Sequence, residues 1–453
     1  MTTNGGSPHA VVIGAGFCGL TAAHELAKCG FLVTVLEQDS EIGGLAGSFN
    51  VGSTRLEKFY HHWFTSDRHI MGLIDELGVR DNIVLRPTNT GLYYANTIFR
   101  LSSPIDVLRF KPLPLIDRFR LGVLALYARR IHDWKKLESL TAAQWLRGIS
   151  GKRAYEVVWE PLLRGKFGIY ADEVSAVWFW NKLKLRGGSR DEGGAERLAY
   201  YRGGFAALAD RVASDIRERG GTIRTGAAAT RLMSSGGRCT GVVVDGEELP
   251  AEIVVATAAL PIVADLVAPH VPEDYAATLR QIKYLGNLCL VLELDRSLSN
   301  TYWLNINDPE FPFVGVIEHT NFEPPGSYGG RHIVYLSKYL PDTDPYFNMS
   351  DDEALRYTIP HLKRMFPQFA QEWILGFHVW RARYSQPVVE RNYSRLIPSS
   401  ETPLQGLYLA SMAQVYPEDR GTNYAVREGR RVASLVTERH AQGKHPAVGG
   451  LRT

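Results

Sequence analysis

The chain has 453 residues, of which 45% are hydrophobic and 22% are charged, and its formal net charge is +3. This length exceeds one ordinary hydrophobic core and predicts two domains of a globular protein. So small a net charge does not favour nucleic acid as a partner. The four cysteines are scattered without C-x-x-C spacing, so the sequence carries no metal-cluster signature and fits a reducing cytoplasm.

The sequence contains no segment typical of secretion or of a membrane span. Residues 1–8 are polar and lack the apolar core of a signal peptide. No run of about 18 uncharged apolar residues predicts a membrane-spanning helix. We therefore expect a cytoplasmic protein that acts on a small-molecule substrate.

The first fifty residues contain a glycine-rich turn between two predicted strands. An apolar strand over 10–13 runs into Gly14-Ala15-Gly16-Phe17-Cys18-Gly19, and an amphipathic helix follows. A second apolar strand, over 31–36, ends on Glu37. This order of strand, turn, helix, strand and acidic residue is the context in which G-x-G-x-x-G binds a dinucleotide.

Each glycine of this turn has a physical role. Gly14 permits the sharp turn, Gly16 lets the backbone approach a pyrophosphate, and Gly19 lets the helix pack closely on the strand. The helix N-terminus then faces the anion. Glu37 is placed to accept hydrogen bonds from a ribose diol, which favours FAD or NAD over NADP. Phe17 and Cys18 lie inside the loop, where we expect the cysteine to be a small filler rather than a redox thiol.

A second glycine pair, Gly43-Gly44, follows Glu37 by six residues and precedes Leu45. A flavin needs small residues here because its diphosphate and ribitol extend past the first loop. With these residues the chain resembles the superfamily of FAD-containing amine oxidases, protoporphyrinogen oxidases and phytoene desaturases, in which UDP-galactopyranose mutase is a more distant member. Members often carry Arg where this chain has Gln38 and Leu45. The resemblance thus implies an FAD held more by backbone N–H groups and less by Arg.

Cofactor-domain patterns recur in three separate segments. We therefore expect an α/β fold in which a Rossmann-type FAD-binding domain, of the glutathione reductase-2 type, is interleaved with a mixed α+β substrate domain. The resemblance further implies that the strand after Gly226 contacts the adenine, with Ala229 as the matching residue. The expected ranges are 8–90, 200–265 and 396–440 for the FAD-binding domain, 91–199 and 266–395 for the substrate-binding domain, and 1–7 and 441–453 for flexible termini.

A buried strand over 406–410 and a helix from Thr422 are predicted near the C-terminus. Thr422 or Asn423 is suited to cap this helix, and the positive end of its dipole would face the preceding loop. The resemblance implies that Gly421, Thr422 and Asn423 lie at the flavin pyrimidine ring. The family usually has an Asp for the ribitol just after the strand, whereas this chain offers Ser411 as a hydrogen-bond donor.

Two adjacent histidines, His61 and His62, lie among four aromatic residues in the segment 55–64. The resemblance places this segment beside the flavin ring, so either histidine is a candidate for the catalytic base. The alternative is a pair of histidines hydrogen-bonded in an aromatic core. We expect no metal site, since adjacent histidines rarely chelate together and no carboxylate or cysteine cluster accompanies them.

Arg164, Asp419 and Arg420 are candidates for orienting the substrate. Arg164 and the neighbouring Lys166 would suit an anionic or phosphate-bearing substrate, or they are solvated surface groups. Asp419 and Arg420 immediately precede the flavin-facing helix, or they form a structural ion pair. Many amine oxidases of the superfamily carry a Lys near flavin N5, and 284–287 has none, which weakens the case for amine oxidation with oxygen.

An apolar helix flanked by Arg is predicted within 115–130. Such a helix could lie on an anionic bilayer surface, which would add a peripheral location at the inner face of the membrane. Core packing with basic ends is the interpretation that we prefer.

Together these features predict an FAD-dependent oxidoreductase of the oxidase, desaturase or dehydrogenase type. In this reaction hydride passes from a substrate C–H bond to flavin N5 while a protein base removes a proton. A redox-neutral mutase or isomerase acting on a nucleotide-sugar, resembling UDP-galactopyranose mutase, is the alternative. A non-catalytic flavin-binding protein is the second alternative, because the fold alone does not determine function.

Overall fold

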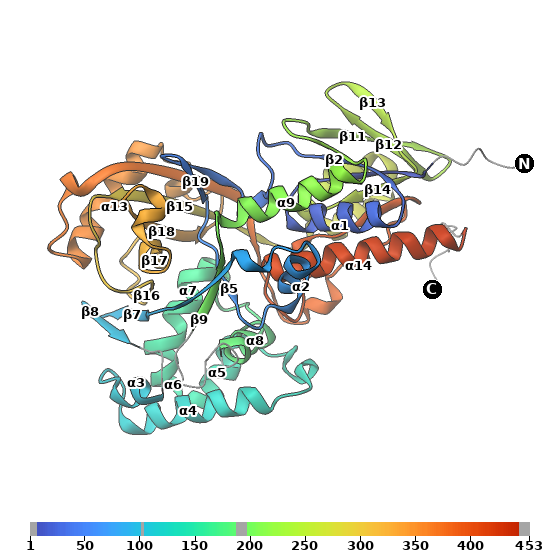
Figure 1. Cartoon of the computed structure of the whole chain (residues 1–453). Coiled ribbons are helices and arrows are strands. Elements are labelled where there is room, and N and C mark those ends of the chain that lie inside the picture. Colours follow the sequence, from blue (N-terminus) through green and yellow to red (C-terminus); the bar gives the residue numbers. More distant parts are fainter. Residues whose placement is uncertain (1–6, 101–103, 187–196, 444–453) are drawn as a thin grey trace, which may run out of the picture.

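The computed structural model describes residues 7–100, 104–186 and 197–443. Figure 1 shows a parallel sheet with its helices in one half of the molecule and a larger sheet with a helical layer in the other. The predicted flexible termini fall almost wholly outside the described residues. None of the helices in the described part of the chain has the length and apolar character needed to cross a bilayer.

A five-stranded parallel sheet carries the glycine turn. Its strand order is β10-β2-β1-β14-β20. The strands predicted over 10–13, 31–36 and 406–410 are all present, and three distant parts of the chain build this one sheet. That arrangement supports the interleaved domain division that we propose from the sequence. The strands are β1 (His9–Ile13), β2 (Leu32–Leu36), β10 (Thr222–Arg224), β14 (Ile253–Ala256) and β20 (Leu407–Leu409).

Both faces of the parallel sheet are covered, which explains why its central strands β1 and β14 are mostly apolar. Side chains alternate between the faces along each strand. Val12 and Val255 belong to the core shared with the helices, whereas Val11 and Val254 belong to the core beneath the antiparallel β-sheet. The helices are α1 (Phe17–Lys28), α9 (Gly204–Glu218) and α14 (Thr422–Ala441), and the antiparallel strands are β11 (Ala229–Ser235), β12 (Arg238–Val244) and β13 (Glu247–Pro250).

Helix α14 packs against α1 through a small residue. A side chain at Gly429 would place its Cβ 2.5 Å from the carbonyl oxygen of Cys18. In the structure the close approach is to α1, because α1 lies between the C-terminal helix and α9 (Figure 1).

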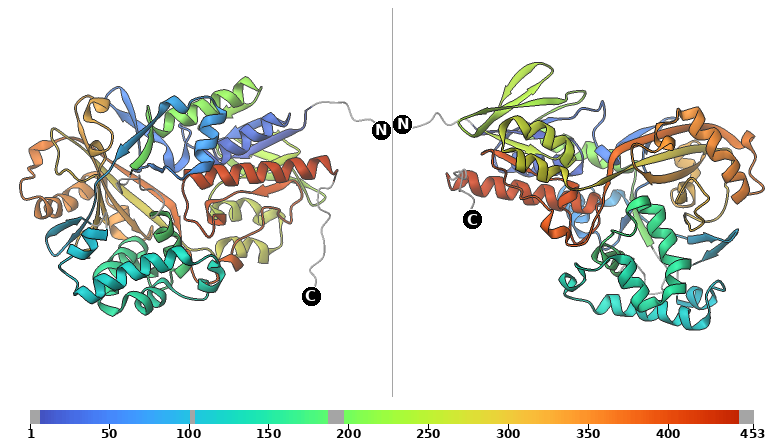
Figure 2. Two further views of the ribbon diagram at one scale, coloured as in Figure 1. Left: turned by 60° about the horizontal axis from the view of Figure 1, so that its bottom comes forward. Right: turned by 180° about the vertical axis from the view of Figure 1, so that it is seen from behind.

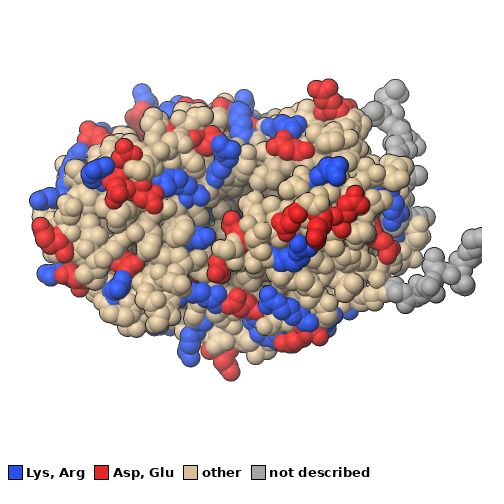
Figure 3. Space-filling model, turned by 90° about the horizontal axis from the view of Figure 1, so that it is seen from above, with Lys and Arg blue, Asp and Glu red and all other residues tan. Residues whose placement is uncertain are grey.

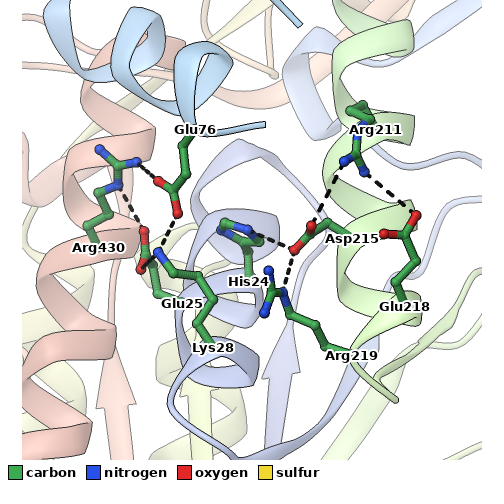
Figure 4. Close-up of polar contacts among 9 residues, drawn as sticks. All are labelled: His24, Glu25, Lys28, Glu76, Arg211, Asp215, Glu218, Arg219 and Arg430. Carbon is green, nitrogen blue, oxygen red and sulfur yellow. Dashed lines mark hydrogen bonds and ion pairs between the residues drawn. The ribbon is translucent and has the colours of Figure 1, made fainter. Parts of the chain in front are cut away.

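Ion pairs join α1, α9, α14 and α2 (Arg68–Glu76), as Figure 4 shows. Lys28 and Arg430 contact Glu25 at 2.8 and 3.0 Å, and both cations also bind Glu76. His24 binds Asp215 of α9 at 2.9 Å. The ligand-type atoms of His24, Glu25 and Glu76 lie close together. Because two cations already neutralise both glutamates, we interpret the cluster as a clamp between helices.

The second half of the molecule is built on a seven-stranded mixed sheet in the order β19-β15-β18-β17-β16-β7-β8. One of its pairings, β16 with β7, is parallel, and the other pairings are antiparallel. The strands are β7 (Thr90–Tyr94), β8 (Thr97–Arg100), β15 (Tyr284–Leu294), β16 (Trp303–Ile306), β17 (Gly315–Glu318), β18 (His332–Leu340) and β19 (Ile374–Pro387).

A layer of helices lies beside this sheet, and short strands connect the two halves. The helices are α3 (Pro104–Arg109), α4 (Leu115–Arg130), α5 (Ala142–Ser150), α6 (Lys152–Ala154), α7 (Glu160–Phe167) and α8 (Ala176–Arg186). The remaining helices are α10 (Leu260–Val267), α11 (Glu273–Arg280), α12 (Pro345–Asn348) and α13 (Asp351–Met365). The connecting strands are β3 (Ser48–Val51), β4 (Thr54–Glu57), β5 (Trp63–Phe64), β6 (Ile83–Pro87) and β9 (Arg197–Tyr201).

The structure confirms core packing for one face of the helix within 115–130, where Leu121, Leu124 and Ala128 are buried, but not for the other face. Helix α4 exposes Leu115 (72%), Phe119 (69%) and Leu126 (55%), so apolar side chains also face away from the core. The helix has two apolar faces, and only one of them can pack on α5 and α8. Figures 1 and 2 place α4 on the outer side of the helical layer.

A buried histidine predicts acid sensitivity of the fold. His319 is 1% exposed, its Nε2 lies 2.6 Å from the hydroxyl of Tyr328, and burial lowers its pKa to about 3. Because the unfolded chain binds this proton more readily, stability is lost as the pH falls below about 6.5, at about 1.4 kcal/mol per pH unit. We expect the free energy of unfolding, measured with urea, to fall less between pH 7 and pH 5 in His319→Gln than in the unchanged protein. The exposed His132 gives the control, and an unchanged slope in His319→Gln would contradict the expectation.

Candidate functional site

A cavity of about 380 Å³ lies where the two halves of the molecule meet. The segment 59–64, helices α7 and α8, strands β16 and β18, and the start of α14 all contribute to its wall. Most of the lining side chains are aromatic or aliphatic, and a few are charged. Segments that are far apart in the sequence therefore form one apolar chamber with localised charges, as small-molecule sites commonly do.

The first glycine turn forms a cradle at the carboxyl end of β1. Gly14 has φ +101°, a conformation that L side chains rarely adopt, and a Cβ on Gly19 would lie 1.9 Å from the Gly14 carbonyl oxygen. Within the described parts of the chain, and apart from its two sequence neighbours, the atom nearest to a Cβ on Gly16 would be the Gly44 Cα at 3.9 Å. The first and third glycines are thus required by the fold, whereas the middle one leaves open space at the start of α1.

Glu37 closes the turn from the end of β2. Its carboxylate accepts hydrogen bonds from the backbone N–H groups of Ala15 at 2.7 Å and Asp39 at 3.0 Å. A carboxylate offers about four acceptor positions, so these bonds fix its orientation and leave capacity for a ribose diol. The neighbouring Gln38 is exposed.

The second glycine pair lies directly beside the first turn. The N–H of Gly43 donates to the carbonyl oxygen of Ala15 at 2.8 Å, and a Cβ on Gly44 would lie 3.2 Å from the Gly16 Cα. Gly44 has φ +59°. Leu45, the next residue, lines the cavity. The two loops therefore lead from the carboxyl end of the parallel sheet to the chamber.

Other residues predicted around the cofactor lie along the same path or at its edge. Phe17 is buried against Phe205. Cys18 donates its Sγ proton to the carbonyl oxygen of Ala410 at 3.3 Å, and burial raises its pKa to about 12, so the group remains a thiol. Ser411 is buried at the end of β20, and Ala229 begins β11.

The start of α14 reaches the cavity without the predicted side-chain cap. Gly421 is the N-cap residue, and no side chain among the described residues caps this helix. Thr422 Oγ1 accepts from Trp63 Nε1 at 2.7 Å. Asn423 Oδ1 accepts from the N–H groups of His69 and Ile70, so it caps α2 instead. The first N–H groups of α14 thus have no side-chain cap and lie at the cavity wall.

Both candidate histidines line the cavity. His61 Nδ1 lies 2.6 Å from the carbonyl oxygen of Phe59, which fixes the proton on Nδ1 and leaves the lone pair on Nε2. Burial lowers the pKa of His61 to about 4. His62 Nδ1 lies 3.0 Å from the hydroxyl of Tyr302. His61 is therefore neutral at physiological pH, with an unprotonated Nε2.

The charged side chains of the cavity surround Asp419. Its carboxylate lies 2.6 Å from Lys182 Nζ and 3.5 Å from Lys166 Nζ, and it accepts from Gln386 Nε2 at 3.2 Å. Burial would raise the pKa of Asp419, but the two lysines and Arg420 outweigh burial and hold this pKa well below its usual range. The carboxylate is ionised and three cations surround it, while a second carboxyl group, Asp67, also lines the cavity, where burial raises its pKa to about 6.

Arg420 extends the cationic region toward β18. Its Nη2 donates to the hydroxyl of Tyr339 at 2.9 Å. Burial would raise the pKa of Tyr339, but Arg420 and Lys166 outweigh burial and lower it. Arg420 Nε and Asn287 Oδ1 are buried and find no hydrogen-bond partner within the described ranges of the chain. These unpaired polar atoms belong to residues that line the cavity, where a ligand could satisfy them.

The prediction for Arg164 is corrected by its position on α7. Its guanidinium is half exposed and pairs with Glu160 at 2.9 Å and Asp172 at 3.3 Å. Lys166, two residues further along, is turned toward the cavity because residues two apart on a helix lie on different faces. The sequence analysis did not select Lys182, Tyr339 or Asn287, which reach the cavity only through the tertiary fold.

The two glycine loops on the parallel sheet and the neighbouring chamber are typical of a dinucleotide-binding protein with a separate substrate sheet. A family model described as flavin containing amine oxidoreductase matches residues 17–437. The chain belongs to this family, and its cofactor is FAD. The resemblance expected from the sequence, and the α/β fold, are thereby confirmed.

Individual relatives are distant. Phytoene dehydrogenase of Streptomyces griseus is 25% identical over 320 residues, 60% of this chain and 59% of that protein. Zeta-carotene desaturase of Arabidopsis thaliana is 20% identical, over 94% of this chain and 85% of that protein. The match to a crystal structure of reduced UDP-galactopyranose mutase covers 95% of this chain and 96% of the mutase chain, with a TM-score of 0.72 and 14% identity. The last comparison shows a shared fold.

The residues present fit FAD. The open space beside Gly16 suits a pyrophosphate, and Glu37 retains capacity to accept from a ribose. The loop of Gly43 and Gly44 presents backbone along the path, and the start of α14 presents its N–H groups at the chamber. These residues are the ones that would hold the cofactor from its adenosine end to its flavin ring.

Proposed function

We propose that the protein dehydrogenates a small anionic substrate. The observation that carries this proposal is the excess of cations in an otherwise apolar chamber. Lys166, Lys182 and Arg420 surround Asp419, and the buried Arg420 Nε is available to an acceptor. An anionic group of the substrate would be held at this end, while the aromatic wall would pack on its carbon skeleton and exclude water.

The chain's own residues would supply positioning and proton transfer. When bound, FAD supplies the hydride acceptor, the flavin N5 atom. Arg420 and Lys166 would orient the substrate through its anionic group. His61 Nε2 would accept the proton that leaves as the hydride is removed, and we propose His62 as the alternative acceptor. A peripheral membrane contact, the other partner expected from the sequence, would involve a different surface, that of α4.

The test is an anaerobic reaction of the FAD-loaded protein with a panel of small carboxylates and phosphate esters. We expect a member of the panel to bleach the oxidised flavin absorbance, and an external acceptor to restore it. In Arg420→Gln the concentration needed for half-maximal bleaching should rise by about tenfold, because one charged hydrogen bond is lost. In His61→Asn the rate should fall by about a hundredfold without that shift in concentration.

Two other outcomes would overturn the proposal. Turnover of a nucleotide-sugar by the dithionite-reduced protein, with no acceptor consumed, would establish a redox-neutral mutase. Neither bleaching nor turnover, in a protein that binds FAD stoichiometrically, would favour a non-catalytic flavin-binding protein. Asp172→Asn is the matched control for Arg420→Gln, since Asp172 pairs with Arg164 outside the cavity. In this control the substrate concentration needed for half-maximal bleaching should be unchanged.

A further inference from the structure

The outer surface of α4 carries a continuous apolar stripe. Successive residues of an α-helix are turned by about 100°, so Leu115, Phe119 and Leu126 fall close to one line along the helix. Exposed Leu108, at the end of α3, adds to the apolar surface of this region. The stripe consists of Leu115, Ile116, Phe119, Val123, Leu126 and Tyr127, and all six side chains are exposed.

The opposite face of α4 fixes the orientation of this stripe. Leu121, Leu124 and Ala128 are buried at 8%, 0% and 0% exposure and belong to the cores beneath the helix. Trp180 of α8 donates its Nε1 proton to the carbonyl oxygen of Ala128 at 2.8 Å. Because one apolar face already packs on the helical layer, the stripe cannot turn inward without giving up that packing.

Basic residues are concentrated around the stripe. The segment 106–136 contains eight Lys and Arg and three Asp, a net charge of +5, while the whole chain carries only +3. On the helix, Arg120 flanks the stripe on one side and Arg129 on the other, and Arg130 lies at its C-terminal end. The face of the molecule seen in Figure 3, opposite to the side of α4 in Figure 1, shows Lys and Arg intermixed with Asp and Glu.

We propose that α4 docks the protein on an anionic lipid bilayer. The helix would lie in the plane of the interface with the stripe among the acyl chains and the flanking Arg side chains at the lipid phosphates. A second copy of the chain fits less well, because a symmetric contact through α4 would oppose two surfaces of the same strong positive charge. This inference concerns a surface separate from the cavity and does not depend on the proposed reaction.

The test is flotation of the full-length, FAD-loaded protein with lipid vesicles. Vesicles of phosphatidylcholine alone are compared with vesicles that contain phosphatidylglycerol, at low and high salt. We expect binding to the anionic vesicles that weakens with salt. Phe119→Glu combined with Leu126→Glu should lower the partition coefficient by more than about tenfold, because charge enters the acyl region. Arg129→Gln combined with Arg130→Gln should lower it by about tenfold and remove the preference for anionic lipid.

Leu375→Glu is the matched control, because Leu375 is 55% exposed on β19 and lies outside the stripe. Bound flavin and the thermal unfolding midpoint of each variant show whether it is folded. The control should float as the unchanged protein does. The proposal is overturned if the unchanged protein fails to float, or if the Phe119 and Leu126 variant floats equally well. It is also overturned if the unchanged protein does not bind vesicles and light scattering shows that it is a dimer, whereas the Phe119 and Leu126 variant is a monomer.

Discussion

Gly16→Ala is expected to leave the protein folded but to lower its affinity for FAD by at least about tenfold. The added Cβ meets no protein atom within 3.9 Å, and the backbone at this position has a φ of −70°, which any residue can adopt. The methyl group would instead occupy the space that a pyrophosphate needs beside the start of α1. Flavin fluorescence titration of the apoprotein measures the affinity, and circular dichroism measures the fold.

Two further glycines make this prediction specific. Gly19→Ala should reduce both folding stability and flavin content, by about 1–3 kcal/mol in stability, because its Cβ would lie 1.9 Å from a backbone oxygen. Gly148→Ala in α5 is the control, since its Cβ would meet no atom within 4 Å among the described residues outside the backbone of its own helix. Equal FAD affinity of Gly16→Ala and the unchanged protein would contradict the placement of the cofactor.

Asp419→Asn is expected to destabilise the protein by about 2 kcal/mol. The carboxylate is buried at 6% exposure, and its removal leaves Lys166 and Lys182 without their counter-charge. Loss of one partner from a buried pair costs about 3–5 kcal/mol. We expect less here because the two lysine side chains are 23% and 37% exposed. Urea unfolding at pH 7 with saturating FAD measures the difference.

The pH dependence gives a second readout for Asp419. Its folded pKa lies well below the usual value, so its contribution is present above the unfolded pKa of about 4 and is lost as the pH falls through the folded pKa. Asp419→Asn should therefore differ most from the unchanged protein at neutral pH and least in strong acid. The exposed Asp172 provides the control, for which removal of the charge should cost about 0.5 kcal/mol or less. An equal loss of unfolding free energy in Asp419→Asn and in the Asp172 variant would contradict the prediction that burial makes the Asp419 charge more important.

Local patterns in the sequence were sufficient to predict the cofactor half of the molecule. The strand, turn and helix around Gly14 follow from short-range rules, because the two strands and the helix between them are consecutive in the chain. The strand at 407–409 and the helix from Thr422 were predictable for the same reason. Each of these elements has one apolar surface or is buried on both sides, so its hydrophobic pattern has a single interpretation.

The substrate side could not be predicted with the same detail. Arg164 and Lys166 are two residues apart on α7, and no local rule states which of their faces meets the cavity. Tyr339 lies on β18, which reads in sequence as an ordinary buried strand. Helix α4 is apolar on two faces, and periodicity alone does not say which face is packed. In all three cases the answer depends on contacts between distant segments, which a single sequence does not reveal.

The interleaved sheet has a consequence for biosynthesis. The glycine fingerprint leaves the ribosome within the first fifty residues, but β14 and β20 complete the sheet beside it only after residues 256 and 409 have been made. Helix α14, which packs on α1 and reaches the cavity, follows last. A nascent chain therefore carries the dinucleotide signature long before it has a flavin site, and its early strand β1 lacks its second partner, β14, until about 240 further residues have been made.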